Sequence, residues 1–361
     1  MLTLGIAGTA KNTGKTTTAT LVMAQALRRG ISTGLTGIGF DGEELDNVTG
    51  LPKPRILVER GTWVAVAEGC LAVSEARVEP AVRSGVKTPL GEVVIGEVRT
   101  RGRLTLAGPN KRRELRLVLD LLAKTDCPLC LVDGALNRIV PMVETDALIL
   151  ATGAARTTDL DRLAAEAGAV AALFALPGVP EGVLMPPVIA LGTADGRLEQ
   201  FSQGSLLETG AARSVAERVS KATTAIFLPG IATEQCLAEL IEGIGPRWPG
   251  KALVLASVPH ILAFGRPREF GGLLDAVRGY GGSVAVYRPL PLLAVTVNPF
   301  HPEAGPQTMR PAYVDAIALE KAVREKVAVP VIDVARSGGG RLGEIVLGQR
   351  KESGDGEGIG G

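Results

Sequence analysis

The sequence of 361 residues predicts an α/β fold in which the strands of parallel sheets alternate with crossover helices. Three observations support this prediction. Short apolar runs typical of buried strands recur along the chain, segments with helical spacing separate most of them, and one region alternates apolar and polar residues as β-hairpins do. Hydrophobic residues make up 46% of the chain, which is enough to build more than one core.

The first half of the chain predicts a regular series of strands and helices. The clearest helix covers residues 15–29, because its apolar residues recur with helical spacing, at Ala19, Val22, Met23, Ala26 and Leu27. The other elements expected here are strands at 2–8 and 32–40, hairpins within 51–108, a helix around 115–122, strands at 130–134 and 146–155, a helix at 158–174 and a strand near 188–193.

From about residue 215 the alternating pattern restarts. Apolar runs typical of strands lie at 225–230, 252–257, 283–289, 292–299 and 329–334. We therefore expect a first domain over 1–195 with a β-rich insertion at about 51–108, a second α/β domain over 215–335, and a flexible tail over 336–361. The tail is expected because the end of the chain is rich in glycine and polar residues.

The segment between the first strand and the first helix is GTAKNTGKTT, residues 8–17. A strand, a turn of small residues, Gly-Lys-Thr and a helix together are typical of a phosphate-binding loop, in which backbone amides and the helix N-terminus surround phosphate oxygens. We expect Lys15 to reach the β- and γ-phosphates as a catalytic residue, and Gly14 to let the backbone approach them closely. The residues expected to bind nucleotide are Gly8, Thr9, Ala10, Lys11, Asn12, Thr13, Gly14, Lys15, Thr16 and Thr17.

The spacing of this loop differs from the usual G-x-x-x-x-G-K-[ST] form. Five residues separate Gly8 from Gly14, and Thr9 occupies the position of the first glycine. The alternative is a chance Gly-Lys-Thr on an ordinary turn. With this loop after its first strand, the predicted fold is a P-loop NTPase parallel sheet with a β-hairpin insertion, followed by a second α/β domain.

Two carboxylates are expected to serve the metal ion that phosphoryl transfer needs. Asp133 ends the apolar run LCLVD, as the acidic residue of a Walker B strand does, and Asp41 follows the second strand. We expect Thr16, Asp133 and Asp41 to hold Mg²⁺ and both aspartates to act in catalysis. A strand-end cap at Asp133 and a solvated acidic loop at Asp41 are the alternatives, and Glu43 and Glu44 compete with Asp41.

The net charge, the apolar runs, the cysteines and the histidines give no sign of a further function. A net charge of +1 gives no reason to expect a nucleic acid or a membrane as a partner. No signal peptide or membrane span is expected, so the expected location is cytoplasmic. Cys127 and Cys130 form a C-x-x-C pair but are expected to be structural, and His260 and His301 are expected to be surface or packing residues.

Two polar segments leave alternatives open. KTPLGEV (87–93) is either a switch segment in which Thr88 senses the γ-phosphate or a plain turn. Lys111, Arg112 and Arg113 stand at a helix start, where the helix dipole disfavours cations. They indicate either an anionic partner or a solvated face.

Several stretches together resemble the P-loop subunit of the lysine 5,6-aminomutase reactivase (KamB type), and more broadly the dethiobiotin synthetase-like P-loop proteins. They are GTAKNTGKTT, DGEELDNVTGLPKPRI, KTPLGEV, LAGPN, VDGALNR, ILATGAA, FLPGIATEQCLAELI and LLAVTVNPFHPEAG. The resemblance implies ATP and Mg²⁺ as ligands, with the nucleotide work done by Gly8, Gly14, Lys15, Thr16 and Asp133. It also implies a second ATPase subunit and an adenosylcobalamin-dependent aminomutase as partners, with ATP use driving the release of damaged cobalamin.

Two other functions are compatible with the same residues. One is an ATP-dependent small-molecule ligase or kinase of the dethiobiotin synthetase type, and the other is a scaffold that binds nucleotide without hydrolysing it. ATP and GTP both remain open, although the sequence has no Asn-Lys-x-Asp stretch of the kind that reads guanine.

Overall fold

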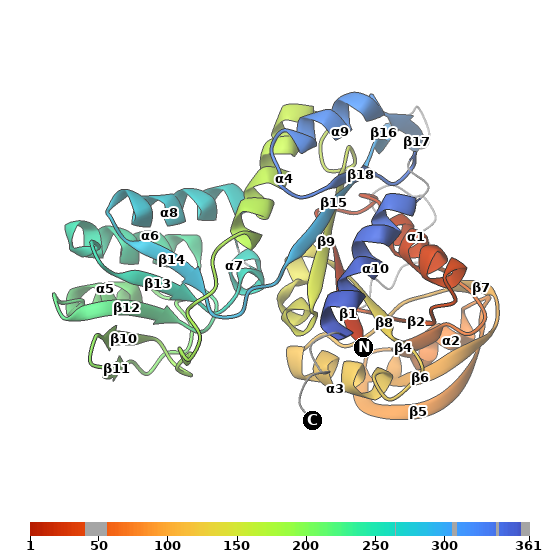
Figure 1. The fold of residues 1–361 in the computed structure, drawn as a ribbon, viewed down its shortest axis with the longest axis horizontal. Helices are drawn as coiled ribbons and strands as arrows, with labels where there is room; N and C mark the ends of the chain where they lie inside the picture. Colours follow the sequence, from red (N-terminus) through yellow and green to blue (C-terminus); the bar gives the residue numbers. More distant parts are fainter. Residues whose placement is uncertain (40–55, 264, 305–308, 337–338, 355–361) are drawn as a thin grey trace. The chain divides into compact units, whose positions relative to one another are not determined.

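The computed structural model describes residues 1–39, 56–263, 265–304, 309–336 and 339–354. The chain divides into two compact units (Figure 1). The first consists of Met1–Ala167 together with Leu292–Gly361, and the second is Gly168–Pro291.

The described residues of the first unit form a nine-stranded sheet with the order β18-β15-β9-β1-β8-β2-β4-β6-β5. The strands from β18 to β4 run parallel, whereas β6 is antiparallel to both β4 and β5. Their bounds are β1 Leu2–Gly8, β2 Thr33–Gly37, β4 Trp63–Ala67, β5 Arg77–Thr88, β6 Gly91–Thr100, β8 Leu129–Ala135, β9 Ala147–Gly153, β15 Leu292–Asn298 and β18 Val331–Asp333. The α/β fold with a parallel sheet is therefore confirmed.

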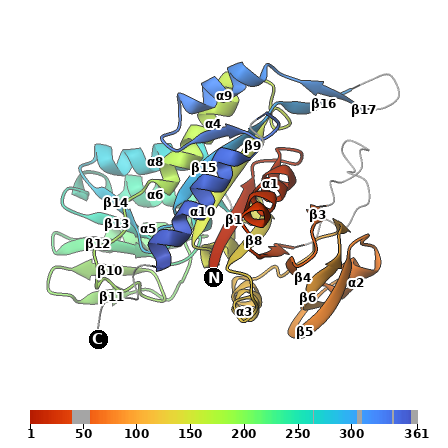
Figure 2. The ribbon, with the colours of Figure 1, turned by 45° about the vertical axis from the view of Figure 1, so that its right-hand side comes forward.

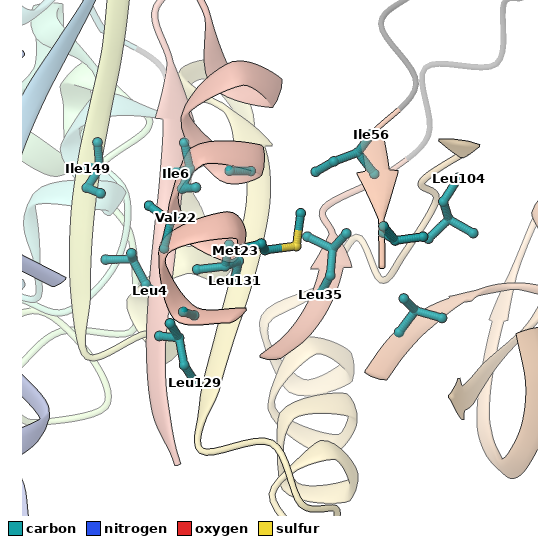
Figure 3. Packing of buried hydrophobic residues seen from close by; sticks show 14 of the residues in the cluster. Leu4, Ile6, Val22, Met23, Leu35, Ile56, Leu104, Leu129, Leu131 and Ile149 are labelled. Atoms are coloured by element: carbon teal, nitrogen blue, oxygen red, sulfur yellow. The ribbon is translucent and has the colours of Figure 1, made fainter. Parts of the chain in front are cut away.

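The main core of this unit lies between the central strands and helix α1 (Lys15–Arg28). Val22 and Met23 of α1 pack against Leu4 and Ile6 of β1 and Leu131 of β8 (Figure 3). The other helices are α2 (Glu68–Ala72), α3 (Arg112–Leu122), α9 (Ala316–Arg324) and α10 (Gly340–Gly354), with the 3₁₀ turns η1 (Leu136–Arg138) and η2 (Val140–Glu144). The apolar stripe predicted for α1 thus faces the sheet.

The region predicted to form hairpins widens the sheet at one edge. Strands β5 and β6 form a long antiparallel hairpin, and β3 (Ile56–Val58) pairs with β7 (Gly102–Leu104) in a separate two-stranded sheet. Thr88 lies at the hairpin turn, where its hydroxyl donates to the carbonyl of Gly91 at 2.8 Å. The structure thus places Thr88 in a plain turn on the edge strand. A second hairpin, β16 (Phe300–Ala304) with β17 (Met309–Tyr313), follows β15.

The second unit has its own smaller sheet, with the order β11-β10-β12-β13-β14 in the described residues. Strands β12 (Thr223–Leu228), β13 (Ala252–Leu255) and β14 (Ser283–Val286) are parallel to one another. Strand β10 (Ala190–Thr193) is antiparallel to both of its neighbours, β12 and β11 (Leu198–Gln200). Its helices are α5 (Thr209–Arg218), α6 (Glu234–Ile244), α7 (Val258–Leu262) and α8 (Pro267–Gly279), with η3 (Gly245–Arg247). Helix α4 (Leu160–Phe174) begins in the first unit and ends in the second. Trp248 and Phe270 are fully buried.

This division differs from the predicted domains 1–195 and 215–335. Strands β15 and β18 return to the first sheet, where β15 pairs with β9 and β18 pairs with β15. The periodicity predicts both strands correctly, but it carries no information about which sheet they join, because strand pairing is non-local.

The structure also differs from the expectation of a flexible tail over 336–361, because part of this segment is helical. Residues Gly340–Gly354 form helix α10, which lies beside α1 (Figure 2). Leu342 and Val346 of α10 are fully buried in the main core. These two apolar residues lie one helical turn apart, which is a signal for an amphipathic helix. The glycine-rich and polar residues that follow them make the whole segment resemble a flexible tail.

Among the described helices, none has the length and apolarity needed to cross a bilayer.

Candidate phosphate-binding site

The predicted loop lies between β1 and α1, at the carboxyl end of the middle strand in the parallel part of the sheet. Strand β1 ends at Gly8 and α1 begins at Lys15. Two residues of the loop have left-handed backbone conformations, Asn12 with φ 61° and Gly14 with φ 93°. Thr13 is buried, and its hydroxyl donates to the carbonyl of Ala10 at 2.9 Å. The loop is therefore a closed turn with a defined backbone path.

The amides of this loop divide into two groups. The amide of Thr9 donates to the carbonyl of Ala151 at 3.0 Å, which extends the pairing of β1 with β9. In the described part of the chain, we find no protein acceptor for the amides from Asn12 to Thr16. Consecutive amides with left-handed residues among them form an anion-binding nest, and the N-terminus of α1 adds its positive partial charge. The loop thus has the backbone chemistry of a phosphate site.

Lys15 folds back over the start of the loop. An ideal Cβ at Gly8 would lie 2.5 Å from the Cδ of Lys15 and 2.6 Å from its Cγ. The Lys15 side chain therefore occupies the space that a side chain at residue 8 would fill. This arrangement holds the lysine along the loop instead of letting it extend from the helix into solvent.

Thr16 and Asp133 lie on the same face of the sheet. Asp133 pairs in register with Ile6 of β1, as Leu131 pairs with Leu4, so its side chain points to the face that α1 covers. Thr16 is the second residue of α1, and both side chains are half-buried. Of the predicted metal ligands, the structure brings these two to the same end of the same face.

The described donor set fits Mg²⁺ bound together with phosphates. No group of three or more His, Cys, Asp or Glu able to hold a metal occurs among the described residues. Mg²⁺ is commonly held by one or two carboxylates together with substrate phosphates and water, so a hydroxyl and one carboxylate beside an anion nest suit it. Asp41, with its competitors Glu43 and Glu44, lies outside the described residues.

The other residues predicted to bind nucleotide lie around the loop at different exposures. Ala10 is half-buried, and Lys11 and Thr17 are exposed. Thr9 places its hydroxyl 3.0 Å from that of Thr152 on β9. The structure brings all ten residues from Gly8 to Thr17 into one turn and the first turn of α1.

Two of the three basic residues at the start of α3 make internal ion pairs. Lys111 pairs with Glu114 at 3.2 Å, and Arg112 pairs with the buried carboxylate of Glu144. These contacts favour the interpretation of this segment as a solvated face over that of a site for an anionic partner.

The cysteines are buried, and the two histidines are half-buried. All four cysteines are buried free thiols, and burial raises the pKa of Cys127 and Cys130. The Nδ1 of His260 lies 2.8 Å from the hydroxyl of the buried Ser257, in the second unit. His301 is half-buried on β16.

Two residues beside the loop are not among those predicted from the sequence. The side-chain amide of Asn298, at the end of β15, donates to the carbonyl of Asn12 at 3.0 Å. An ideal Cβ at Gly14 would lie 3.3 Å from both Asn298 Cβ and Val334 Cγ2. The only sequence signal for Asn298 is an Asn-Pro pair that ends an apolar strand, and this pattern also occurs at ordinary turns.

Comparisons with known proteins give little further information. No family model matches the chain, and no curated protein matches it. Among solved structures, the one titled "Structure of pnob8 ParA" matches with a TM-score of 0.27 and 12% sequence identity, covering 60% of this chain and 70% of that chain. At this level the similarity carries no weight, so the class of the protein follows from its own geometry.

The fold and the loop define the class. A parallel sheet has its glycine-bordered loop after a central strand, a Lys-Thr pair opening the next helix, and an aspartate on the neighbouring strand. This combination is typical of the P-loop NTPase type of α/β fold.

Proposed function

We propose that this chain binds a magnesium–nucleoside triphosphate at residues 8–17 and hydrolyses it slowly. The observation that carries this proposal is the run of amides from Asn12 to Thr16, which have no acceptor in the described protein and which Lys15 borders. Such a run of amides in a closed turn is costly without an anion or water, and it suits a phosphate chain. We assign ATP as the nucleotide because the sequence lacks a guanine-reading Asn-Lys-x-Asp stretch.

Each part of the site would then have one task. The amides and the Lys15 ammonium hold phosphate oxygens, and Lys15 balances the negative charge that grows on them during transfer. The Thr16 hydroxyl and the Asp133 carboxylate hold Mg²⁺. When bound, Mg²⁺ supplies Lewis-acid stabilisation of the phosphate oxygens. The buried aliphatic core beneath α1 keeps the helix, and therefore Thr16, fixed relative to β8.

We further propose that the hydrolysis acts on a protein partner. The resemblance of several segments to the KamB-type reactivase subunit supports a second ATPase subunit and an adenosylcobalamin-dependent aminomutase as partners. Release of γ-phosphate is a suitable switch for such a task, because it can order or free loops at a protein interface. Cofactor release from the mutase would be the outcome of that switch.

Hydrolysis measurements test both parts of the proposal, the nucleotide hydrolysis itself and its dependence on protein partners. Purified protein with Mg²⁺ and ATP should show slow basal hydrolysis, which should rise when the aminomutase and the second ATPase subunit are added. Lys15→Ala should lose the activity, and Lys124→Ala, which removes an exposed lysine on the loop after α3, should retain it.

The other outcomes identify the alternatives. ADP release that depends on a small metabolite and ignores the mutase would favour a ligase or kinase. A nucleotide that raises the melting temperature without any turnover would favour a scaffold. Neither binding nor turnover in the wild-type protein would overturn the proposal as a whole.

A further inference from the structure

We propose that Asn298 is a positioning residue that holds the phosphate-binding loop in its anion-binding conformation. The inference rests on the proposed nucleotide site and adds to it a residue 286 positions away from Asn12 in sequence. Both residues belong to the first unit, which the returning strand β15 completes.

The hydrogen bond from Asn298 fixes one peptide group of the loop. Its Nδ2 donates to the carbonyl of Asn12 at 3.0 Å, while its Oδ1 accepts from the amide of Phe300 at 3.2 Å. The carbonyl of Asn12 and the amide of Thr13 share one planar trans peptide, in which they point in opposite directions. Holding the carbonyl toward Asn298 therefore turns the Thr13 amide away from β15, and this is one of the amides without a protein acceptor.

The loop needs such a contact because its conformation is uncommon. Asn12 is the one non-glycine residue with a positive φ in the described part of the chain. Asparagine tolerates this conformation better than most residues, but the conformation still costs energy unless its surroundings stabilise it. The bond to Asn298 supplies that stabilisation at the residue concerned.

The same face of β15 also anchors the start of α1. Residues 296 and 298 are two apart on the strand, so their side chains point to one face. The hydroxyl of Thr296 lies 2.9 Å from that of Thr18, and Thr18 donates to the carbonyl of Gly14 at 2.9 Å. Both Thr18 and Thr296 are fully buried. Strand β15 therefore bonds directly to the loop at Asn12 and is linked through Thr18 to Gly14, on the other side of Thr13.

Amide hydrogen exchange in the absence of nucleotide tests the inference directly. Asn298→Asp keeps the size and the Oδ1 acceptor but removes the donor, and Asn298→Ala removes both. We expect the amides of Thr9 and Thr18, which donate to Ala151 and Gly14 at the two ends of the loop, to exchange about 3-fold to 10-fold faster in both variants. The loop should open more often because it has lost one hydrogen bond between neutral groups. Asn137→Ala, which removes an exposed asparagine at the same edge of the sheet, should leave the exchange of both amides unchanged.

Two results would overturn the inference. One is unchanged exchange of the Thr9 and Thr18 amides in both Asn298 variants. The other is an equal acceleration throughout β1 and β9, which would mean that Asn298 stabilises the whole unit and not the loop. Because this measurement needs no nucleotide, it remains decisive even if the proposed function fails.

A second arm links the loop to the ligand. With Mg²⁺ and ATP, Asn298→Ala should raise KM by about 3-fold to 10-fold, and this rise should exceed any fall in kcat, because a preorganised loop favours bound ground state and transition state alike. Faster loop exchange with an unchanged KM would contradict the role in nucleotide binding. Failure of the wild-type protein to turn over ATP would instead count against the proposed function.

Discussion

The side chain of Lys15 lies across the backbone of Gly8, with its Cδ 2.5 Å from the position that a β-carbon on residue 8 would take. Carbon atoms that are not bonded do not approach so closely, because their optimal separation is about 3.5–4.0 Å. The absence of a side chain at residue 8 is therefore what lets the lysine fold back along the loop. The backbone of Gly8 itself has no positive φ, so the requirement for glycine here is steric.

Gly8→Ala should weaken nucleotide binding without unfolding the protein. The added methyl group must displace the flexible Lys15 side chain, so we expect Mg–ATP affinity to fall by about 10-fold or more while the free energy of unfolding changes by only about 1 kcal/mol. Gly210→Ala on α5 is the matched control, since an ideal Cβ there meets nothing within 4 Å. Calorimetric titration and urea denaturation measure the two quantities. Unchanged affinity in Gly8→Ala would show that the position of Lys15 over Gly8 does not matter for binding.

Asp133→Asn should separate binding from turnover. The amide keeps the shape of the side chain but binds Mg²⁺ more weakly, so we expect turnover to fall by about 100-fold and the affinity for a slowly hydrolysed analogue to fall by less than about 10-fold. Asp126→Asn, at an exposed position before β8, should change neither. Equal losses of turnover and affinity would indicate a structural role for Asp133.

Leu342→Ala should destabilise the first unit, because α10 is part of its core. Leu342 is fully buried, and truncating a buried leucine typically costs about 2–5 kcal/mol. Leu117→Ala on α3, where the leucine is 44% exposed, should cost far less. Urea denaturation of the two variants measures the difference. Similar stabilities for both would contradict the packing of α10 against α1.

Stability should decrease in alkaline solution because of the buried thiols. Burial raises the pKa of Cys70 to about 11, whereas an unfolded thiol has a pKa of about 8.5. The folded state then keeps a proton that the unfolded state loses, so the stabilising effect is complete below about pH 8.5 and declines as the pH rises toward 11.

Between pH 8.5 and pH 10 we expect a loss of about 1.5 kcal/mol from Cys70. The loss should be smaller in Cys70→Ala, and urea denaturation at several pH values measures it. A wild-type stability that stays constant from pH 8 to pH 10, or a Cys70→Ala variant with the same slope, would contradict this prediction.

Most of the local structure could be predicted from the sequence, because it depends on neighbouring residues. The apolar stripe of α1 and the short apolar runs of β1, β8 and β9 have periodicities that few other structures share. The loop at residues 8–17 could be predicted for the same reason, since its chemistry is contained in ten consecutive residues.

The parts that could not be predicted depend on pairing between distant segments. The return of β15 and β18 to the first sheet is set by contacts with β9, which no local pattern encodes. Asn298 acquires its contact with Asn12 only through that return. The position of Asp133 on the α1 face likewise follows from its register with Ile6, although its residue type at a strand end was a sufficient signal to propose it.

Titration calorimetry with Mg²⁺ and a slowly hydrolysed ATP analogue tests the central claim most directly. The wild-type protein and Lys124→Ala should give a saturable heat of binding, and Lys15→Ala should lose it, because the lysine at the loop supplies the positive charge that balances the phosphates. No heat with the wild-type protein, or the same heat with Lys15→Ala, would contradict the assignment of residues 8–17 as the site of a triphosphate.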